Sequence, residues 1–293
     1  MFFERNIVII FGKLYNIYEK EGKIMDKRPI GIFDSGVGGL TVLTEIKKRL
    51  PNENLIYLGD TKNFPYGNKT KEQIIEFAIE NTEKLIEMGA KVIVIACGTA
   101  TSQSLEILRA KFSTPIIGII EPTVEYVKEE NINRIGVIAT EGTIRSGAWE
   151  KVLKQQIENI EVINKACPML ATIAEEGRAT SEEGRAVIKE YMEPFKNAKI
   201  NKIILGCTHY PIYENLIRQE LGYPVELINT GITVSETLAQ FLNDKNLLND
   251  NIHNEDLIFL TKPEEEFEII AKNLLNFDIK IRQISWHIRI LWI

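Results

Sequence analysis

Short apolar runs alternate along this chain with longer segments in which apolar residues recur every three or four positions. Runs of this length, bounded by Gly, Pro or polar residues, are typical of buried parallel strands, and the longer spacing is typical of amphipathic helices. The runs predict strands over 29–33, 55–58, 92–96, 115–120, 134–139, 161–164, 202–205 and 225–228. The helical spacing predicts helices over 40–50, 71–88, 102–112, 146–156, 181–195 and 232–243. This alternation favours an α/β fold with mostly parallel sheets.

The pattern of the first half restarts near residue 134. Ile30 and Ile135, each followed by glycine at the start of a predicted strand, are 105 residues apart, and Cys97 and Cys207 are 110 residues apart. Offsets this similar indicate an internal duplication, with chance similarity among short strands as the alternative. We therefore predict two pseudo-symmetric three-layer α/β domains with the active site in the cleft between them.

The first predicted domain comprises residues 27–121 together with 230–293, because the last elements are expected to return and pack on the first half. The second comprises residues 122–229. Residues 1–24 precede Met25 and contain a short apolar stretch that no small-residue cleavage site follows. A dispensable N-terminal extension is therefore expected there rather than a signal peptide.

Composition excludes several classes of protein. A chain of 293 residues that is 44% hydrophobic can bury a large core, and its formal net charge of −6 argues against a nucleic-acid partner. No apolar run approaches the roughly 18 residues that a membrane span requires, so no membrane partner is expected. Three cysteines without framework spacing fit a reducing compartment, and we expect a cytoplasmic location.

Two of the cysteines follow predicted strands in matching contexts, Ile95-Ala-Cys97-Gly-Thr and Leu205-Gly-Cys207-Thr-His. Ligands bind beyond the carboxyl ends of the strands in open α/β sheets, and a following helix N-terminus favours a thiolate. The pair therefore predicts two thiols that face each other across a cleft, a suitable arrangement for acting on both faces of one carbon. Either cysteine alone could equally be a small core residue, which is what we expect of Cys167.

Other polar residues cluster at the same strand ends. Asp34, in Asp-Ser-Gly-Val-Gly-Gly, either caps a helix or reaches the cleft, and His209 lies two residues after Cys207. The glycine-rich turn lacks the residues of a P-loop and the full dinucleotide fingerprint, so close backbone approach to a small anion is the favoured interpretation. Glu175 and Glu176 are expected to form the solvated end of a helix, with a place at the entrance to the cleft as the alternative.

Six segments together resemble the glutamate racemases of the aspartate/glutamate racemase superfamily. The match runs from about Lys27 to beyond Gly231 and rests on Pro29-Ile-Gly-Ile-Phe-Asp-Ser-Gly-Val-Gly-Gly-Leu, Pro65-Tyr-Gly, Ile95-Ala-Cys-Gly-Thr-Ala-Thr, Ile120-Glu-Pro, Ala139-Thr-Glu-Gly-Thr and Leu205-Gly-Cys-Thr-His-Tyr-Pro. The resemblance implies an enzyme without a cofactor or metal that interconverts L- and D-glutamate, supplies D-glutamate for peptidoglycan and forms a homodimer.

The resemblance also assigns roles to individual residues. Cys97 would take the proton from the D-isomer and Cys207 from the L-isomer, with Asp34 and His209 assisting the thiols. The residues implied to hold the substrate are Asp34, Ser35, Pro65, Tyr66, Gly67, Gly98, Thr99, Thr143, Thr208 and His209.

One position departs from the family pattern. The family has asparagine between the first cysteine and threonine, and its side chain contacts the substrate, whereas this chain has Gly98. A lost hydrogen bond to a charged group costs about 1.5–3 kcal/mol, although water in the vacated space would restore part of it. We therefore expect weaker affinity or altered specificity rather than an inactive enzyme. Asn229, where an acidic residue is common, is a lesser departure.

Several alternatives stay open. Cys97, Cys207 and His209 could bind zinc in a hydrolase, although no compact ligand spacing supports this. An aspartate racemase or a cofactor-free decarboxylase would use the same scaffold, because pocket volume sets substrate length. A non-catalytic amino-acid-binding protein is a further possibility because of Gly98.

Overall fold

The computed structural model describes residues 6–10, 13–20, 23–249, 256–262, 267, 271, 275 and 280–283. Its largest sheet is parallel and has six strands in the order β13-β12-β5-β4-β6-β7. Four of these strands come from the first part of the chain: β4 (Ile30–Asp34), β5 (Leu55–Gly59), β6 (Val92–Ile95) and β7 (Ile116–Gly118). Each of these four strands is buried along its whole length, as expected of a parallel sheet covered on both faces.

The second sheet is also parallel and has four strands in the order β11-β10-β8-β9. Its strands are β8 (Arg134–Ala139), β9 (Glu161–Ala166), β10 (Lys202–Leu205) and β11 (Glu226–Asn229). In chain order, both β4–β7 and β8–β11 are arranged as second, first, third and fourth strand across their sheets. This shared order confirms the predicted pseudo-symmetry, and it makes β6 and β10 equivalent strands.

Helices cover both faces of the six-stranded sheet, and we call this assembly the first unit. Helices α1 (Leu40–Arg49) and α10 (Thr230–Asp244) pack together over one face, and α2 (Lys71–Glu87) and α3 (Gly98–Lys111) pack together over the other. Helix α2 begins with a capping box between Thr70 and Gln73, which satisfies two backbone N–H groups at its first turn. The predicted helices of this half are confirmed, except that α3 begins four residues before the predicted start at Ser102, directly after Cys97.

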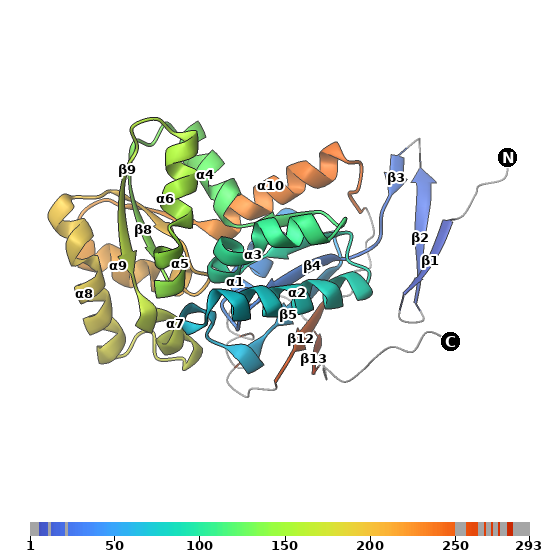
Figure 1. Ribbon diagram of the computed structural model, residues 1–293, viewed down its shortest axis with the longest axis horizontal. Helices are drawn as coiled ribbons and strands as arrows, with labels where there is room; N and C mark the ends of the chain where they lie inside the picture. The colour runs from blue at the N-terminus through green and yellow to red at the C-terminus, as the bar shows by residue number, and fades with distance from the viewer. Residues whose placement is uncertain are drawn as a thin grey trace.

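The second unit consists of the four-stranded sheet and the helices around it. Its helices are α4 (Ile120–Glu129), α5 (Glu141–Ser146), α6 (Ala148–Gln156), α7 (Pro168–Glu175), α8 (Glu182–Ala198) and α9 (Glu214–Leu221). Figure 1 shows this unit beside the first, with α8 and α9 at its far side. The strand predicted over 115–120 was wrong at its end, because the apolar run continues from β7 directly into α4. Pro122 is compatible with the first turn of that helix, since the N–H that it lacks would be unpaired there.

One apolar core joins the two units. It contains residues of β4 and β6, of β8 and β10, and of the helices α1, α4, α6 and α10. Between α4 and α10, the hydroxyls of Thr123 and Thr233 form a hydrogen bond of 2.7 Å inside this core. Two further cores lie on the opposite faces of the sheets, one under α2 and α3 and the other under α7, α8 and α9. Both units are therefore three-layer sandwiches, as predicted.

The ends of the chain occupy different places. Strands β1 (Asn6–Ile10), β2 (Lys13–Lys20) and β3 (Lys23–Met25) form an antiparallel sheet of their own, which Figure 1 shows at the end of the molecule away from the second unit. Strand β12 (Leu257–Leu260) pairs with β5, and β13 (Lys280–Gln283) pairs with β12. Both strands thus belong to the sheet of the first unit. Of the predicted first domain, residues 250–255, 263–266, 268–270, 272–274, 276–279 and 284–293 lie outside the described residues. Within the described residues, no helix combines the length and apolarity that a membrane crossing demands.

A buried ion pair lies at the amino ends of β5 and β6, opposite the carboxyl ends that carry the predicted site. The Nζ of Lys91 lies 2.7 Å from Oε2 of Glu53, and both side chains are almost completely buried. Lys91 also donates to the carbonyls of Asp26 and Leu247 at 2.7 Å, and the other oxygen of Glu53 accepts from the N–H of Asn249 at 2.8 Å. Burial lowers the pKa of Lys91 and raises that of Glu53, so the mutual attraction and these hydrogen bonds are needed to hold the charges there.

Replacing Lys91 should therefore destabilise the fold strongly. We expect Lys91→Met to lower the free energy of unfolding by about 3–5 kcal/mol, because it leaves the Glu53 carboxylate buried without a counter-charge. Urea denaturation followed by circular dichroism measures this loss. The control is Lys128→Met, in an exposed pair with Glu125 at 3.4 Å, which should cost less than about 1 kcal/mol. Equal losses in the two variants would contradict this account of the buried pair.

Candidate active site

Two cysteines lie at equivalent positions, just beyond the carboxyl ends of β6 and β10. Cys97 caps the N-terminus of α3, and its Sγ accepts from the N–H of Ala100 at 3.5 Å. Cys207 follows Gly206 at the end of β10 and precedes the short helix η3 (Tyr210–Tyr213). Both thiols are almost completely buried. The two turns touch, since a Cβ built on Gly98 would lie 2.3 Å from the carbonyl oxygen of Gly206.

The turn after β4 brings a carboxylate to the same place. Oδ2 of Asp34 accepts from the N–H groups of Gly36 and Gly39, both at 3.1 Å, so its own turn holds the side chain. Oδ1 accepts from the hydroxyl of Thr208 in the second unit at 3.3 Å. Ser35, the next residue, lies 3.8 Å from Cys97 between Oγ and Sγ. Asp34 and Ser35 thus connect the two cysteine turns.

His209 and Glu175 form a second connection between the units. Nδ1 of His209 lies 3.6 Å from Sγ of Cys207, and its Nε2 lies 2.7 Å from Oε1 of Glu175. The same carboxylate oxygen accepts from the backbone N–H of Val37, in the glycine-rich turn of the first unit, at 2.6 Å. In that turn, a Cβ built on Gly38 would lie only 2.5 Å from the His209 ring, so a side chain at this position would require the ring to move.

Burial sets the protonation of this cluster. It raises the pKa of Asp34 from 3.8 to about 6, although the positive charge of His209 opposes the shift. Burial, followed by the negative charge of Asp34, raises the pKa of Cys97 from 9.0 to about 12, although the N–H of Ala100 favours the thiolate. Burial alone would lower the pKa of His209, but its hydrogen bonds to Cys207 and Glu175 raise it well above 6.5. The His209 ring is therefore positively charged at neutral pH, next to the sulfur of Cys207.

Three threonine hydroxyls meet between α3 and α5. Oγ1 of Thr99 lies 2.8 Å from that of Thr140 and 3.2 Å from that of Thr143, and the last two are 2.8 Å apart. Thr140 also caps α5, since its hydroxyl accepts from the N–H of Thr143 at 3.3 Å. This trio supplies uncharged donors from both units beside Cys97.

The predicted residues of the loop after β5 adjoin the same region. Tyr66 lies in the short helix η2 (Tyr66–Asn68) and follows Pro65, which is joined to Phe64 by a cis peptide bond. The hydroxyl of Tyr66 donates to Oδ2 of Asp60 at 2.5 Å, so this side chain is directed into the first unit. A Cβ on Gly67 would lie 3.0 Å from Cβ of Thr140, which leaves the backbone of Gly67 facing the second unit.

The structure thus brings the predicted site residues together from both units, and their roles remain predictions. It corrects one expectation, because Glu175 was expected in solvent and instead is largely buried between His209 and Val37. Glu176 is exposed as expected and pairs with Arg178. Cys167 is completely buried in the core under α7, α8 and α9, which confirms its expected packing role. Sequence reasoning also missed Thr140, although its motif was among those that carry the resemblance.

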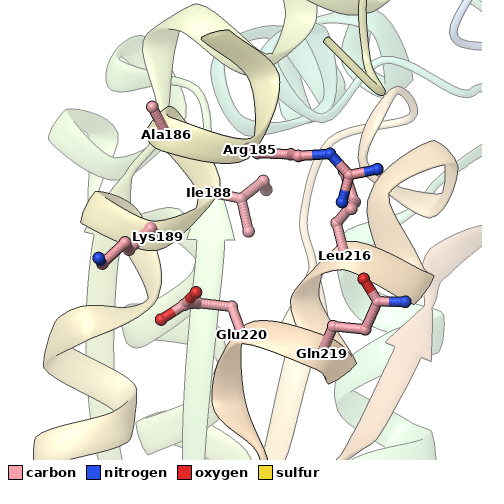
Figure 2. Close-up of a pocket in the computed structure, with 7 residues that line it drawn as sticks. All are labelled: Arg185, Ala186, Ile188, Lys189, Leu216, Gln219 and Glu220. Carbon is pink, nitrogen blue, oxygen red and sulfur yellow. The ribbon is translucent and has the colours of Figure 1, made fainter. Parts of the chain in front are cut away.

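A groove lies outside this region. It has a volume of about 300 Å³ and lies between α8 and α9, and Arg185, Lys189 and Glu220 are among the residues that line it (Figure 2). None of the predicted site residues borders it. Across the part of the chain that the structure describes, no group of three or more His, Cys, Asp or Glu side chains is arranged to hold a metal ion. The zinc-hydrolase alternative therefore has no ligand set among these residues.

Comparison with known proteins places the chain in a family. Residues 38–234 match the family model described as Asp/Glu/Hydantoin racemase. A protein of Bacillus cereus named glutamate racemase is 40% identical over 235 residues, which cover 80% of this chain and 87% of that protein. The structure of a glutamate racemase isoform from Bacillus anthracis superposes with a TM-score of 0.84 at 36% identity, covering 88% of this chain and 98% of that one.

The structure of a glutamate racemase from Francisella tularensis in complex with D-glutamate is also similar to this chain. It superposes with a TM-score of 0.83 at 35% identity and covers 89% of this chain and 98% of its own. The chain belongs to the Asp/Glu/hydantoin racemase family, and within it groups with the glutamate racemases.

Proposed function

We propose that this protein interconverts L- and D-glutamate without a cofactor, with Cys97 and Cys207 as the two groups that exchange protons with the substrate. The observation that carries the proposal is the meeting of the two cysteine turns from equivalent strands of two pseudo-symmetric units. A racemase must remove a proton from one face of Cα and deliver one to the other face. Two opposed thiols perform both transfers without any rotation of the substrate.

The proton balance of this reaction is simple. With D-glutamate, the Cys97 thiolate takes the α-proton and becomes a thiol, while the Cys207 thiol gives its proton to the opposite face of Cα. The electron pair of the broken C–H bond ends in the new C–H bond. Cys207 is then the thiolate, which is the form required to take the α-proton of L-glutamate. Each turnover therefore prepares the enzyme for the reverse reaction.

The charged neighbours have complementary tasks in this proposal. The protonated ring of His209 directs Nδ1–H to Sγ of Cys207 and stabilises a thiolate there. Burial and the negative charge of the nearby Asp34 instead oppose the ionisation of Cys97. We infer that the Asp34 carboxylate accepts the thiol proton of Cys97 as this cysteine is activated, and that the ammonium group of the substrate, by adding positive charge, favours the resulting thiolate.

Uncharged donors would hold the substrate and the charge that develops on it. Around the cysteines are the hydroxyls of Ser35, Thr99, Thr143 and Thr208 and the backbone at Gly67. Hydroxyls and N–H groups fixed in a buried site stabilise developing negative charge more strongly than water does. Such stabilisation is needed here because loss of the α-proton makes Cα carbanion-like next to a carboxylate that is already negative.

Glutamate is favoured over aspartate as the substrate because similar proteins carry the name glutamate racemase and one similar structure holds D-glutamate. The direct test incubates the purified chain with each enantiomer of glutamate and of aspartate without added cofactor, followed by chiral chromatography. Racemisation of glutamate supports the proposal. Racemisation of aspartate alone would indicate an aspartate racemase, and release of carbon dioxide would indicate a decarboxylase.

The biological setting is part of the same proposal. The resemblance implies that the D-glutamate produced is used for peptidoglycan and that the enzyme is a homodimer. Three cysteines, two of them required as free thiols, fit the reducing cytoplasm. Light scattering of the purified chain measures its oligomeric state.

Each of the two central thiols should be indispensable. We expect Cys97→Ser and Cys207→Ser each to lower kcat by at least about 10²–10⁴, because a hydroxyl at neutral pH is a poor base. Cys167→Ala is the control, since this cysteine is buried in the core and should leave kcat unchanged. Chiral assay of the three variants makes the comparison, and full activity in either serine variant would remove the two-thiol proposal.

Activity should depend on the ionisation of Asp34. Its pKa of about 6 in the free enzyme means that its charged form is lost as the pH falls through 6. We expect kcat/KM, which reports groups of the free enzyme, to fall about tenfold for each unit below that value. In Asp34→Asn, the residual kcat/KM should be low and show no such decline between about pH 5 and 7. An unchanged acid decline in the variant would assign the titration to another group.

The Glu175 carboxylate should act through His209. Removing its charge in Glu175→Gln weakens a hydrogen bond to a charged partner, worth about 1.5–3 kcal/mol, so kcat should fall about tenfold to a hundredfold. The pKa of His209, followed by NMR, should fall in the same variant. Glu176→Gln is the matched control on the adjacent, exposed residue and should change neither quantity. Equal behaviour of the two variants would show that Glu175 has no special role.

A further inference from the structure

The backbone contact between Gly98 and Gly206 is unusually close. Gly98 is the first residue of α3 in the first unit, directly after Cys97, and Gly206 directly precedes Cys207 in the second unit. A Cβ on Gly98 would lie 2.3 Å from the carbonyl oxygen of Gly206. Real contacts of a Cβ are essentially never this short, so any side chain at this position requires a movement. A main-chain carbonyl therefore lies where the first carbon of a side chain at position 98 would be.

Gly206 cannot retreat into its own unit. Its N–H donates to the carbonyl of Ile138 in the neighbouring strand β8 at 2.8 Å. The position of a Cβ on Gly206 lies 2.8 Å from both that carbonyl oxygen and Nε1 of Trp149, and the indole is 1% exposed. The turn before Cys207 is thus supported from behind by a strand and a large buried ring.

Gly98 is fixed to a similar degree in the first unit. The N–H of Thr101 donates to the carbonyl of Cys97 at 2.9 Å, and the N–H of Ala100 donates to its sulfur. The side chain of Ile119 lies 3.5 Å from the position of a Cβ on Gly98. Since these hydrogen bonds hold the turns on both sides of the contact, we expect a larger residue at position 98 to move the two cysteine turns apart.

We propose that Gly98 is a positioning residue, and that its lack of a side chain sets how closely the two thiols approach the α-carbon between them. This inference rests on the proposed function and adds a determinant of its rate. Proton transfer requires the donor and acceptor to be within hydrogen-bond reach of the reacting carbon, and a misplacement of about 1 Å can cost about a hundredfold in rate. A side chain at this position would lengthen both transfers together.

The alternative interpretation of Gly98 is that it lacks an amide that would bind the substrate, and the two interpretations differ for asparagine. If the missing amide matters, Gly98→Asn raises kcat/KM and Gly98→Ala changes little. If the contact distance matters, both substitutions lower kcat, because each adds the Cβ that meets the Gly206 carbonyl.

The test measures kcat and KM of Gly98→Ala and Gly98→Asn for both enantiomers of glutamate. We expect kcat to fall about tenfold to a hundredfold in both variants, with KM changed less than about threefold. Glu106→Ala, on the exposed face of the same helix, is the control that should match the wild type. Wild-type kcat in the alanine variant, or a gain in kcat/KM in the asparagine variant, would overturn the proposal.

A second measurement needs no substrate and tests the separation directly. Iodoacetamide labelling, resolved by mass spectrometry, should be faster at Cys97 and Cys207 in both Gly98 variants, because these thiols lie at the contact. Cys167 is buried away from it and serves as the internal control. Faster labelling at all three cysteines would indicate general unfolding, and unchanged labelling at all three would indicate no separation, so either outcome would overturn the proposal. Absence of racemisation in the wild type would refute the proposed function, while this labelling would still decide the inference.

Discussion

Two thiols can act on opposite faces of one carbon only if the carboxyl ends of two parallel sheets are held against each other. The strand order repeated in the two units places β6 and β10 at equivalent positions, and each strand delivers its cysteine to its own end. Small residues then let the ends meet. Gly98 approaches the Gly206 carbonyl, and one oxygen of Glu175 accepts from both units, from Val37 and from His209. The remaining features of the site depend on this apposition.

The apposition has an electrostatic consequence, because it buries several ionisable groups in a small volume. Burial opposes every isolated charge there, which is why the pKa values of Asp34 and Cys97 are raised. The His209 ring stays charged only because Cys207 and Glu175 surround it. The sulfur of Cys207 therefore lies next to a cationic ring, whereas the nearby charge that acts on Cys97 is the carboxylate of Asp34. Such an asymmetry suits a reaction in which one sulfur must be charged and the other neutral at each start.

Most of the fold could be predicted from the sequence, because short apolar runs indicate buried strands. The centre of the site could be predicted because a cysteine directly follows two of these runs. The helices α4, α5, α7 and α9 could not be predicted, since α4 begins within an apolar run that is typical of a strand and the other three are short. The residues next to Glu175 do not indicate its buried position. Its partners are 34 residues away in the sequence at His209 and 138 residues away at Val37. At Gly98, the sequence shows a missing side chain, and only the three-dimensional contact shows what fills its place.

The most direct test of the central claim follows the α-proton itself. Purified enzyme is given protiated L-glutamate in deuterium oxide, and the Cα–H signals of both enantiomers are measured by NMR and chiral separation at low conversion. With opposed thiols, D-glutamate should carry deuterium at Cα from its first appearance, because Cys97 donates a solvent-derived proton, while the remaining L-glutamate keeps protium. D-Glutamate that retains the original proton would show that a single group carries it across, and would contradict the account.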